Sequence, residues 1–245
     1  MLNVLFWLGI ILGVVIGLIV TIIVVLNFIF IVLQNEKYSD DTRFKFVSWI
    51  VSWASPLFTN AKVDIEGLDY INEVETGVIY ANHQSIFDIF ATVEVIKRKH
   101  GYIAKEEIGS VFLLNRGMRL IRCEFLPRED NRAAVKVILE AIKTVKMGHI
   151  MVIFPEGTRG INAPMGTFKA GSFKVATKAK ADIIPMTIYN SYEVNKRWPL
   201  STTVRIKVHK PIPYAEYEPF STHEIAEKVE KIVKSDLLGK DITES

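Results

Sequence analysis

The sequence predicts an α/β fold with a largely parallel central sheet flanked by helices, preceded by an N-terminal hydrophobic membrane helix and an interfacial helix. Two observations support this fold class. No charged side chain occurs in the first 34 residues. From about residue 60 onward, strand-like and helix-like segments alternate, which is typical of strand–helix–strand units and a parallel sheet. We therefore divide the 245 residues into a membrane anchor, 1–58, and a second domain, 59–245.

Residues 4–33 are almost wholly apolar, and a bilayer core needs about 20 helical residues. We therefore expect a membrane helix here rather than a buried core helix. A cleavable signal peptide is not expected, because no basic leader and no small-residue cleavage site flank the run. Lys37, Arg43 and Lys45 follow the run and no basic residue precedes it. The positive-inside bias then places the rest of the chain on the cytoplasmic face of the cell membrane.

Glycines recur every fourth residue within this apolar run, at Gly9, Gly13 and Gly17. Such a stripe lets a second helix approach closely, so it is compatible with helix-mediated self-association. Because glycine is also common in membrane helices in general, it is equally plausible that the stripe has no role in helix–helix contact.

A second helix is predicted over residues 44–58. One side of it carries apolar and aromatic residues, namely Phe46, Trp49, Ile50 and Trp53. The segment is too short to span a bilayer, and tryptophan favours the headgroup level. We interpret it as an interfacial helix, with a helix buried in the core as the alternative.

The remaining elements follow from periodicity. Two segments, 61–66 and 203–209, alternate polar with apolar residues and predict strands. Apolar runs predict further strands over 77–81, 102–105, 150–154 and 183–189. Helices are predicted over 86–97, 110–118, 131–147 and 168–179, and a capping box of Ser221 and Glu224 begins a last one that ends near residue 238. Ligands of parallel sheets bind beyond the carboxyl ends of strands, so the strand-to-helix junctions are the candidate sites.

The first junction contains His83 and Asp88, directly after the strand predicted over 77–81. A free imidazole titrates near neutral pH and suits a general base, and a carboxylate can hold it in one tautomer. Positions five apart on an ideal helix differ by about 140°. The two side chains can therefore meet only if His83 lies in the turn and Asp88 lies in the first helical turn. The same letters also fit a plain capping box formed by Ser85 and Asp88.

The second junction is the segment 154–159, Phe-Pro-Glu-Gly-Thr-Arg, after the strand predicted over 150–154. Gly157 allows a sharp turn close to a ligand. Thr158 offers a hydroxyl, and the planar fork of Arg159 suits a phosphate. Glu156 is expected either to accept a hydrogen bond from an acceptor hydroxyl or to orient the arginine. An ordinary surface loop is the alternative.

The two junctions together resemble the glycerolipid acyltransferase family, whose best-known members are the 1-acylglycerol-3-phosphate acyltransferases. The matching segments, in family order over about residues 60–215, are Asn82-His83-x4-Asp88, Phe125-Leu126-Pro127-Arg128, Phe154-Pro155-Glu156-Gly157-Thr158-Arg159 and Ile184-Pro185-Met186. Lys105 sits where members often carry a lysine, although the residues after it depart from the usual pattern. Phe168-Lys169-Ala170-Gly171 also looks typical of the family.

The resemblance implies transfer of a fatty acyl group from acyl-CoA or acyl carrier protein to the sn-2 hydroxyl of lysophosphatidic acid. The product would be phosphatidic acid, within phospholipid biosynthesis. It assigns His83 and Asp88 to catalysis, as general base and as its orienting partner. Substrate binding is assigned to Lys105, Arg128, Glu156, Gly157, Thr158 and Arg159. Membrane phospholipids are the expected surroundings of the lipid substrate.

Several alternatives stay open. Glycerol-3-phosphate or another lysophospholipid is an alternative acceptor, and a non-catalytic lipid-binding membrane protein is an alternative class. The net charge of +3 gives no reason to expect a nucleic-acid partner. Cys123 is the single cysteine, and the other four histidines are scattered. We therefore expect no disulfide, no metal, no resident cofactor and no metal-dependent phosphatase.

Overall fold

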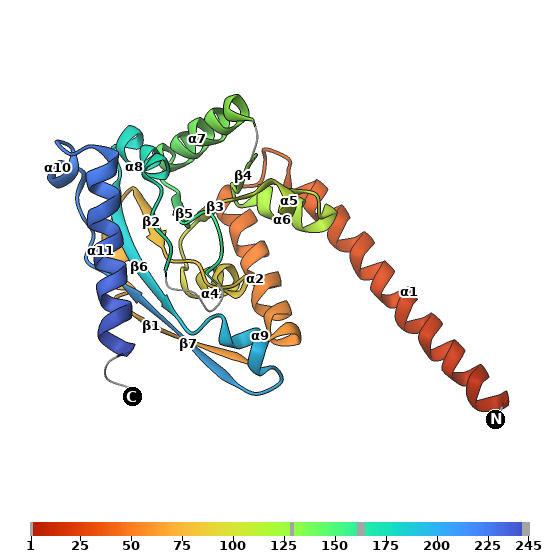
Figure 1. Cartoon of the computed structure of the whole chain (residues 1–245). Coiled ribbons are helices and arrows are strands. Elements are labelled where there is room, and N and C mark those ends of the chain that lie inside the picture. The colour runs from red at the N-terminus through yellow and green to blue at the C-terminus, as the bar shows by residue number, and fades with distance from the viewer. Residues whose placement is uncertain (1, 128–129, 161–164, 242–245) are drawn as a thin grey trace.

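The computed structural model describes residues 2–127, 130–160 and 165–241 (Figure 1). Within them, seven strands form one sheet in the order β1-β7-β6-β2-β5-β3-β4. The strands are β1 (Ala61–Glu66), β2 (Gly77–Ala81), β3 (His100–Lys105), β4 (Glu124–Leu126), β5 (Ile150–Ile153), β6 (Asp182–Tyr189) and β7 (Thr202–Val208). Each strand predicted from the sequence is present, with bounds shifted by at most two residues.

Most neighbouring strands run parallel, as predicted. The central strand β2 pairs parallel with β5 and with β6, and β3 pairs parallel with β5 and β4. The exception is β7, which is antiparallel to β6 and parallel to β1. The carboxyl ends of β2 to β6 therefore share one edge of the sheet, and β1 and β7 end at the opposite edge. Any site built at strand ends has its residues gathered at the first of these edges.

Helices cover both faces of the sheet (Figure 1). The α-helices of the described residues are α1 (Leu2–Leu33), α2 (Asp40–Phe58), α3 (Asp69–Glu73), α4 (Phe87–Val95), α5 (Glu106–Gly109), α6 (Phe112–Leu120), α7 (Asn131–Lys146), α8 (Lys174–Ala179), α9 (Glu193–Arg197), α10 (Tyr214–Tyr217) and α11 (Thr222–Asp241). The helix predicted over 168–179 is divided into a 3-10 turn, Ala170–Phe173, followed by α8. The predicted capping box is formed, since Ser221 and Glu224 exchange hydrogen bonds at the start of α11.

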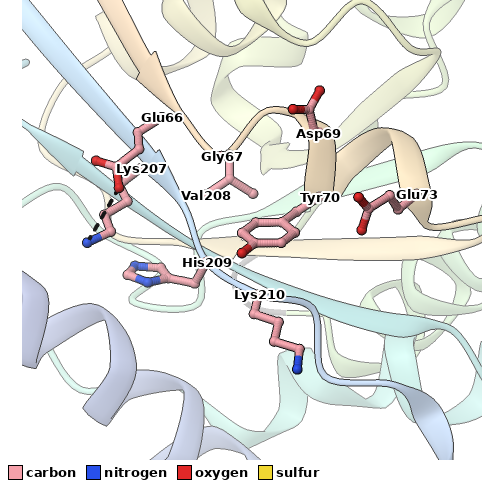
Figure 2. Close-up of a pocket in the computed structure, with 9 residues that line it drawn as sticks. All are labelled: Glu66, Gly67, Asp69, Tyr70, Glu73, Lys207, Val208, His209 and Lys210. Atoms are coloured by element: carbon pink, nitrogen blue, oxygen red, sulfur yellow. Dashed lines mark ion pairs between the residues drawn. The ribbon is translucent and has the colours of Figure 1, made fainter.

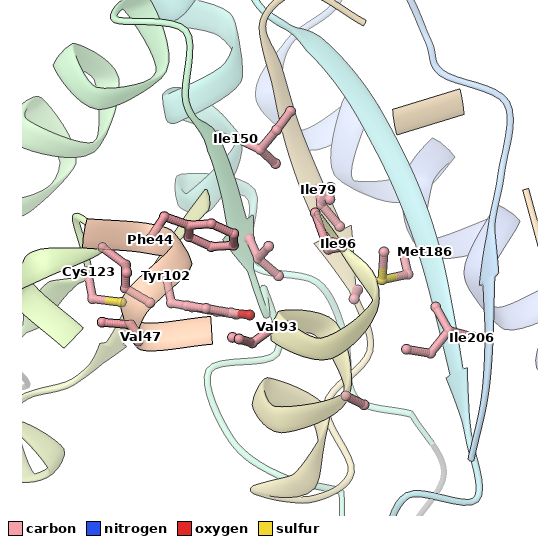
Figure 3. Packing of buried hydrophobic residues seen from close by; sticks show 14 of the residues in the cluster. Phe44, Val47, Ile79, Val93, Ile96, Tyr102, Cys123, Ile150, Met186 and Ile206 are labelled. Atoms are coloured by element: carbon pink, nitrogen blue, oxygen red, sulfur yellow. The ribbon is translucent and has the colours of Figure 1, made fainter. Parts of the chain in front are cut away.

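The buried apolar side chains form two clusters, one on each face. Helices α7, α8 and α11 cover one face together with side chains such as Phe173 and Val229. Helices α2, α4 and α6 cover the other face (Figure 3). There Phe44 and Val47 of α2 pack beside Tyr102 of β3. One side of the second predicted helix is thus part of the core of the domain. The predicted division into a membrane anchor, 1–58, and a second domain, 59–245, stays a prediction.

Helix α2 begins four residues earlier than predicted, because Ser39 caps its first turn by accepting the backbone N–H of Thr42. Its opposite side is open, and Trp49 and Trp53 are both 62% exposed. The two interpretations of this helix therefore apply to different faces of it. One face is buried in the domain, and the tryptophan face is free to meet a lipid headgroup region.

Helix α1 extends away from the domain (Figure 1). Among the described residues, one helix, Asn3–Leu33, is long and apolar enough to cross a membrane. Only its last turns are buried, where Phe30 packs against Gly117 of α6. The glycine stripe at residues 9, 13 and 17 faces open space. Self-association through that stripe stays a prediction.

Asp40 ties the connection between α1 and α2 to the sheet. Its carboxylate accepts hydrogen bonds from Arg43 at 3.0 Å, Arg122 at 3.1 Å and His149 at 3.0 Å. Burial alone raises the pKa of Asp40, but Arg122 and His149 outweigh burial and the pKa is lowered overall. Burial also lowers the pKa of His149 despite Asp40. These contacts join the start of α2 to the residues that precede β4 and β5.

Candidate active site

His83 lies in the turn between β2 and α4, and Asp88 lies in the first turn of α4. The Nδ1 atom of His83 is 2.7 Å from Oδ2 of Asp88. This is the geometry that the five-residue spacing required. A hydrogen bond at Nδ1 fixes the tautomer and leaves Nε2 as the ring nitrogen that can exchange a proton with a substrate. The catalytic role of each residue stays a prediction.

Asp88 also caps the helix that carries it. The same Oδ2 atom accepts the backbone N–H groups of Gln84 at 2.8 Å and Ser85 at 3.0 Å. The hydroxyl of Ser85 accepts the N–H of Phe87 at 3.0 Å. One fully buried carboxylate therefore both caps the helix and contacts the imidazole of His83. Folding of the first helical turn fixes the position of the oxygen that meets His83.

Further contacts hold the imidazole and the turn that carries it. Its ring stacks on Phe154, with 4.2 Å between the ring centroids and 18° between the planes. One residue earlier, the side-chain amide of Asn82 exchanges two hydrogen bonds with the backbone of Ile188, at 2.9 and 2.8 Å. The turn is thereby attached to β6 at the carboxyl edge of the sheet. The site is thus preorganised by strand ends that lie far apart in the sequence.

Glu156 reaches His83 from the second junction. Its buried carboxylate accepts the backbone N–H of His83 at 2.7 Å and that of Gly166 at 2.7 Å. Burial raises the pKa of Glu156, and the two N–H groups offset part of that effect. The N–H of Gly160 in turn donates to the carbonyl of His83 at 2.9 Å. Orientation of Arg159 by Glu156, one of the expected roles, is not what the contacts show, because Glu156 binds backbone groups.

The rest of the second junction faces solvent. Gly157 has a φ of +68°, a conformation that favours glycine, so the sharp turn expected there is present. Thr158 and Arg159 are exposed, and no hydrogen bond or ion pair joins Arg159 to another described residue. An exposed guanidinium beside the His83 turn is free to bind an anion.

Lys169 is a site residue that the sequence interpretation did not assign. Its backbone N–H donates to the carbonyl of Pro155 at 3.0 Å. Its Nζ atom lies so close to Gly157 that a Cβ there would come within 2.6 Å of it. A second cation is thus placed at the turn that carries Arg159. The sequence signal for this residue is the family-like segment 168–171, Phe-Lys-Ala-Gly.

The structure describes one of the other two predicted cations, Lys105, and does not join its side chain to these residues. Lys105 ends β3 at the same sheet edge, in register with Leu126 of β4. Its side chain is half-buried, and no hydrogen bond from it to a described site residue is found. Arg128 lies outside the described residues. Among the residues that are described, no cluster of His, Cys, Asp or Glu is placed to hold a metal ion.

A pocket of about 540 Å³ lies elsewhere (Figure 2). Its walls include Glu66 and Lys207, which belong to the ends of β1 and β7, together with Asp69, Tyr70 and His209. Because β1 and β7 end at the opposite edge of the sheet, this pocket is remote from His83. The polar groups that converge at the carboxyl edge mark the candidate active site instead.

Comparisons with known proteins place both junctions inside a matched family region. The family model described as Acyltransferase matches residues 62–189, which include both junctions. The chloroplast 1-acyl-sn-glycerol-3-phosphate acyltransferase LPAT1 of Arabidopsis thaliana is 31% identical over 183 residues, covering 71% of this chain and 50% of that protein. The human 1-acyl-sn-glycerol-3-phosphate acyltransferase beta is 30% identical over 175 residues, covering 68% of this chain and 61% of the relative. The chain thus spans about half the length of the first of these relatives.

A solved structure is similar over nearly the whole chain. The crystal structure of the 1-acyl-sn-glycerophosphate acyltransferase PlsC from Thermotoga maritima superimposes with a TM-score of 0.71 at 25% sequence identity. The match covers 90% of this chain and 88% of that one. The similarity therefore includes the overall α/β architecture and not only the motifs. With the family model matching more than half of its residues, the chain belongs to the acyltransferase family.

Proposed function

We propose that this protein transfers a fatty acyl group from an acyl thioester to the sn-2 hydroxyl of lysophosphatidic acid, forming phosphatidic acid. The hydrogen bond of 2.7 Å between His83 and Asp88 is the observation that carries the proposal. It gives the fold an oriented base at the sheet edge where α/β proteins bind ligands. The names of the relatives support lysophosphatidic acid as the acceptor.

In the proposed reaction, Nε2 of His83 removes the proton from the acceptor hydroxyl as the oxygen attacks the thioester carbonyl. Asp88 stabilises the imidazolium that forms. The tetrahedral intermediate collapses, the carbon–sulfur bond breaks, and the thiolate takes the proton from the imidazolium. A free thiol has a pKa of about 8.5, so the thiolate leaves without strong acid assistance. One base is sufficient, and no covalent acyl-enzyme is required.

The acceptor phosphate is proposed to bind at the second junction. Arg159 supplies a planar guanidinium, and Lys169 supplies an ammonium beside Gly157. Lys105 lies at the end of a strand on the same edge, and Arg128 is the fourth cation proposed. Two or more cations around one site match the charge of a phosphate monoester better than that of a zwitterionic headgroup. This favours lysophosphatidic acid over lysophosphatidylcholine.

The proposed setting is the cytoplasmic face of the cell membrane, with acyl-CoA or acyl carrier protein as donor. A lysophospholipid keeps its acyl chain in the bilayer while its hydroxyl reaches His83. Helix α1 supplies the apolar length that such an anchor needs. The reaction would serve phospholipid biosynthesis, since its product is a precursor lipid.

An acceptor panel tests the proposal. The purified full chain in detergent is given acyl-CoA or acyl carrier protein as donor. The acceptors are lysophosphatidic acid, glycerol-3-phosphate and lysophosphatidylcholine, and products are identified by mass spectrometry. Phosphatidic acid that forms with the native chain and not with His83→Ala supports the proposal. Transfer to glycerol-3-phosphate alone would change the acceptor, and transfer to none would favour a non-catalytic lipid-binding protein.

A further inference from the structure

A short turn far from the anchor in sequence exposes large apolar side chains. It joins α9 to β7, and in it Trp198 is 58% exposed and Leu200 is 65% exposed. Single exposed apolar residues are common on soluble proteins, whereas neighbouring ones mark interaction surfaces. This turn presents a tryptophan and a leucine on either side of Pro199. The exposure of both side chains on one turn therefore needs an explanation, whereas a single exposed apolar residue does not.

The turn is attached to the segment that follows α2. The side chain of Asn60, two residues after α2, donates a hydrogen bond to the carbonyl of Pro199 at 3.1 Å. The N–H of Thr202 donates to the carbonyl of Asn60 at 3.0 Å. Figure 1 shows α9 beside the end of α2, on the side of the domain toward which α1 extends. The apolar turn is therefore tied to the segment that directly follows α2.

The residues before the turn match the chemistry of a membrane surface. Helix α9 ends with Lys196 and Arg197, directly before Trp198. Basic side chains near an anionic leaflet contribute about 1 kcal/mol each, and tryptophan concentrates at the headgroup level. Exposed apolar residues that follow two basic residues fit an anionic lipid surface. They fit a second copy of this chain less well, because its corresponding turn would carry the same positive charge.

We propose that Trp198 and Leu200 insert into the interfacial region of the lipid bilayer and give the domain a membrane contact separate from α1 and α2. The contact also sets the orientation of the active site. Helix α9 follows β6, and the backbone of Ile188 in β6 is bonded to Asn82, next to His83. Docking through this turn brings the edge of the sheet that carries His83 to the bilayer, where a lysophospholipid resides.

The chain allows a site-specific test. Cys123 is 2% exposed, and burial raises the pKa of its thiol to about 12. A cysteine introduced at an exposed position is therefore labelled selectively. Leu200→Cys places an environment-sensitive fluorophore on the turn. Leu139→Cys is the matched control, because Leu139 is 50% exposed on α7, which lies on the side of the domain away from α1 (Figure 1).

The labelled full-length chains are reconstituted in vesicles of phosphatidylcholine with or without phosphatidylglycerol. Quenching by lipids that carry a nitroxide on the acyl chain is compared with quenching by aqueous iodide. We expect the label at position 200 to be quenched by the lipid probe and protected from iodide, more so with phosphatidylglycerol. The label at position 139 should show the reverse. Iodide access at position 200 equal to that at position 139 would overturn the proposal.

Two further measurements separate the other outcomes. Protection that grows with protein concentration in detergent, with cross-linking between copies at position 200, would show that a second copy covers the turn and would also overturn the proposal. The double variant Trp198→Ser, Leu200→Ser should lose activity several-fold on an acceptor embedded in vesicles and keep it on a short-chain soluble acceptor. The quenching result does not depend on the proposed reaction. The proposed membrane contact and the proposed function can therefore fail separately.

Discussion

The carboxylate of Glu156 accepts the backbone N–H of His83 at 2.7 Å, although 73 residues separate them in the chain. Both oxygens of Glu156 bind backbone N–H groups, because Gly166 donates to the second one. Together with the hydrogen bond from Gly160 to the carbonyl of His83, this contact fixes the peptide on both sides of the imidazole. The geometry therefore assigns Glu156 a positioning role for the base.

We expect Glu156→Gln to lower kcat about 10- to 100-fold with little change in the KM for the acceptor. The amide would turn an N–H donor toward one of the two N–H groups that the carboxylate now accepts, and His83 would shift. A misplacement of about 1 Å can cost about 10²-fold in rate. Steady-state kinetics with varied acceptor measure both constants, with the exposed Glu216→Gln as control. A rise in KM at unchanged kcat would place Glu156 on the acceptor instead.

Asp88→Asn should reduce turnover by roughly the same factor as His83→Ala, about 10²–10⁴-fold. Asparagine is nearly isosteric, but one oxygen of Asp88 now faces two backbone N–H groups and Nδ1 of His83. The oxygen of an amide can still accept the capping hydrogen bonds, but it carries no negative charge and so does not stabilise the protonated imidazole. Circular dichroism checks that α4 remains folded. Near-native turnover in Asp88→Asn with an intact helix would leave Asp88 as a cap alone.

Arg159→Ala and Lys169→Ala should each raise the KM for lysophosphatidic acid more than they lower kcat. Both cations lie at the turn around Gly157, and neither is paired with a described carboxylate. Loss of one charged hydrogen bond costs about 1.5–3 kcal/mol, which corresponds to roughly 10- to 100-fold in binding. The measurement is repeated with Lys178→Ala, an exposed lysine on α8, as control. An equal effect of all three variants would point to general charge rather than to a phosphate site.

Hydrophobic periodicity is a local signal, and strand direction is not. The segment 61–66 was predicted as a strand because alternate burial leaves a pattern of period two. That pattern has no direction, so it did not reveal that β7 runs antiparallel to β6. Short elements that are neither alternating nor wholly apolar, such as β4 and α5, give no local signal of this kind. Their conformation is set by the neighbours on which they pack.

The same limit applies to the site. The spacing of His83 and Asp88 was informative because both lie in one turn, where chain geometry restricts the outcome. The contact of Glu156 with the His83 backbone depends on the pairing of β2 with β5, which no local pattern encodes. Lys169 was passed over for a related reason. Its proximity to Gly157 depends on the hydrogen bond from its backbone N–H to the carbonyl of Pro155, 14 residues earlier, and no local pattern encodes that contact.

His100 predicts a pH dependence of stability. It is fully buried, and its Nε2 is 2.9 Å from the hydroxyl of Tyr102, which is 2.7 Å from the hydroxyl of Thr92 in α4. Burial lowers the pKa of His100 to about 4, whereas an exposed histidine has a pKa of about 6.5. Between these values the unfolded chain binds the proton and the folded chain does not. His100 thus favours the folded state above pH ~6.5, and this contribution is lost as the pH falls toward ~4.

The lost contribution is at most about 3 kcal/mol, from a difference of about 2.5 pH units at 1.36 kcal/mol each. Thermal unfolding of the full chain in detergent between pH 7 and 4 measures it. In His100→Gln, which does not titrate in this range, the midpoint should fall less steeply with pH, although burial of a new amide lowers it at every pH. His223→Gln, at an exposed position, should follow the native curve. Parallel curves for the native chain and His100→Gln would contradict the assignment and place the acid sensitivity in other groups, such as His209, whose pKa burial also lowers to about 4.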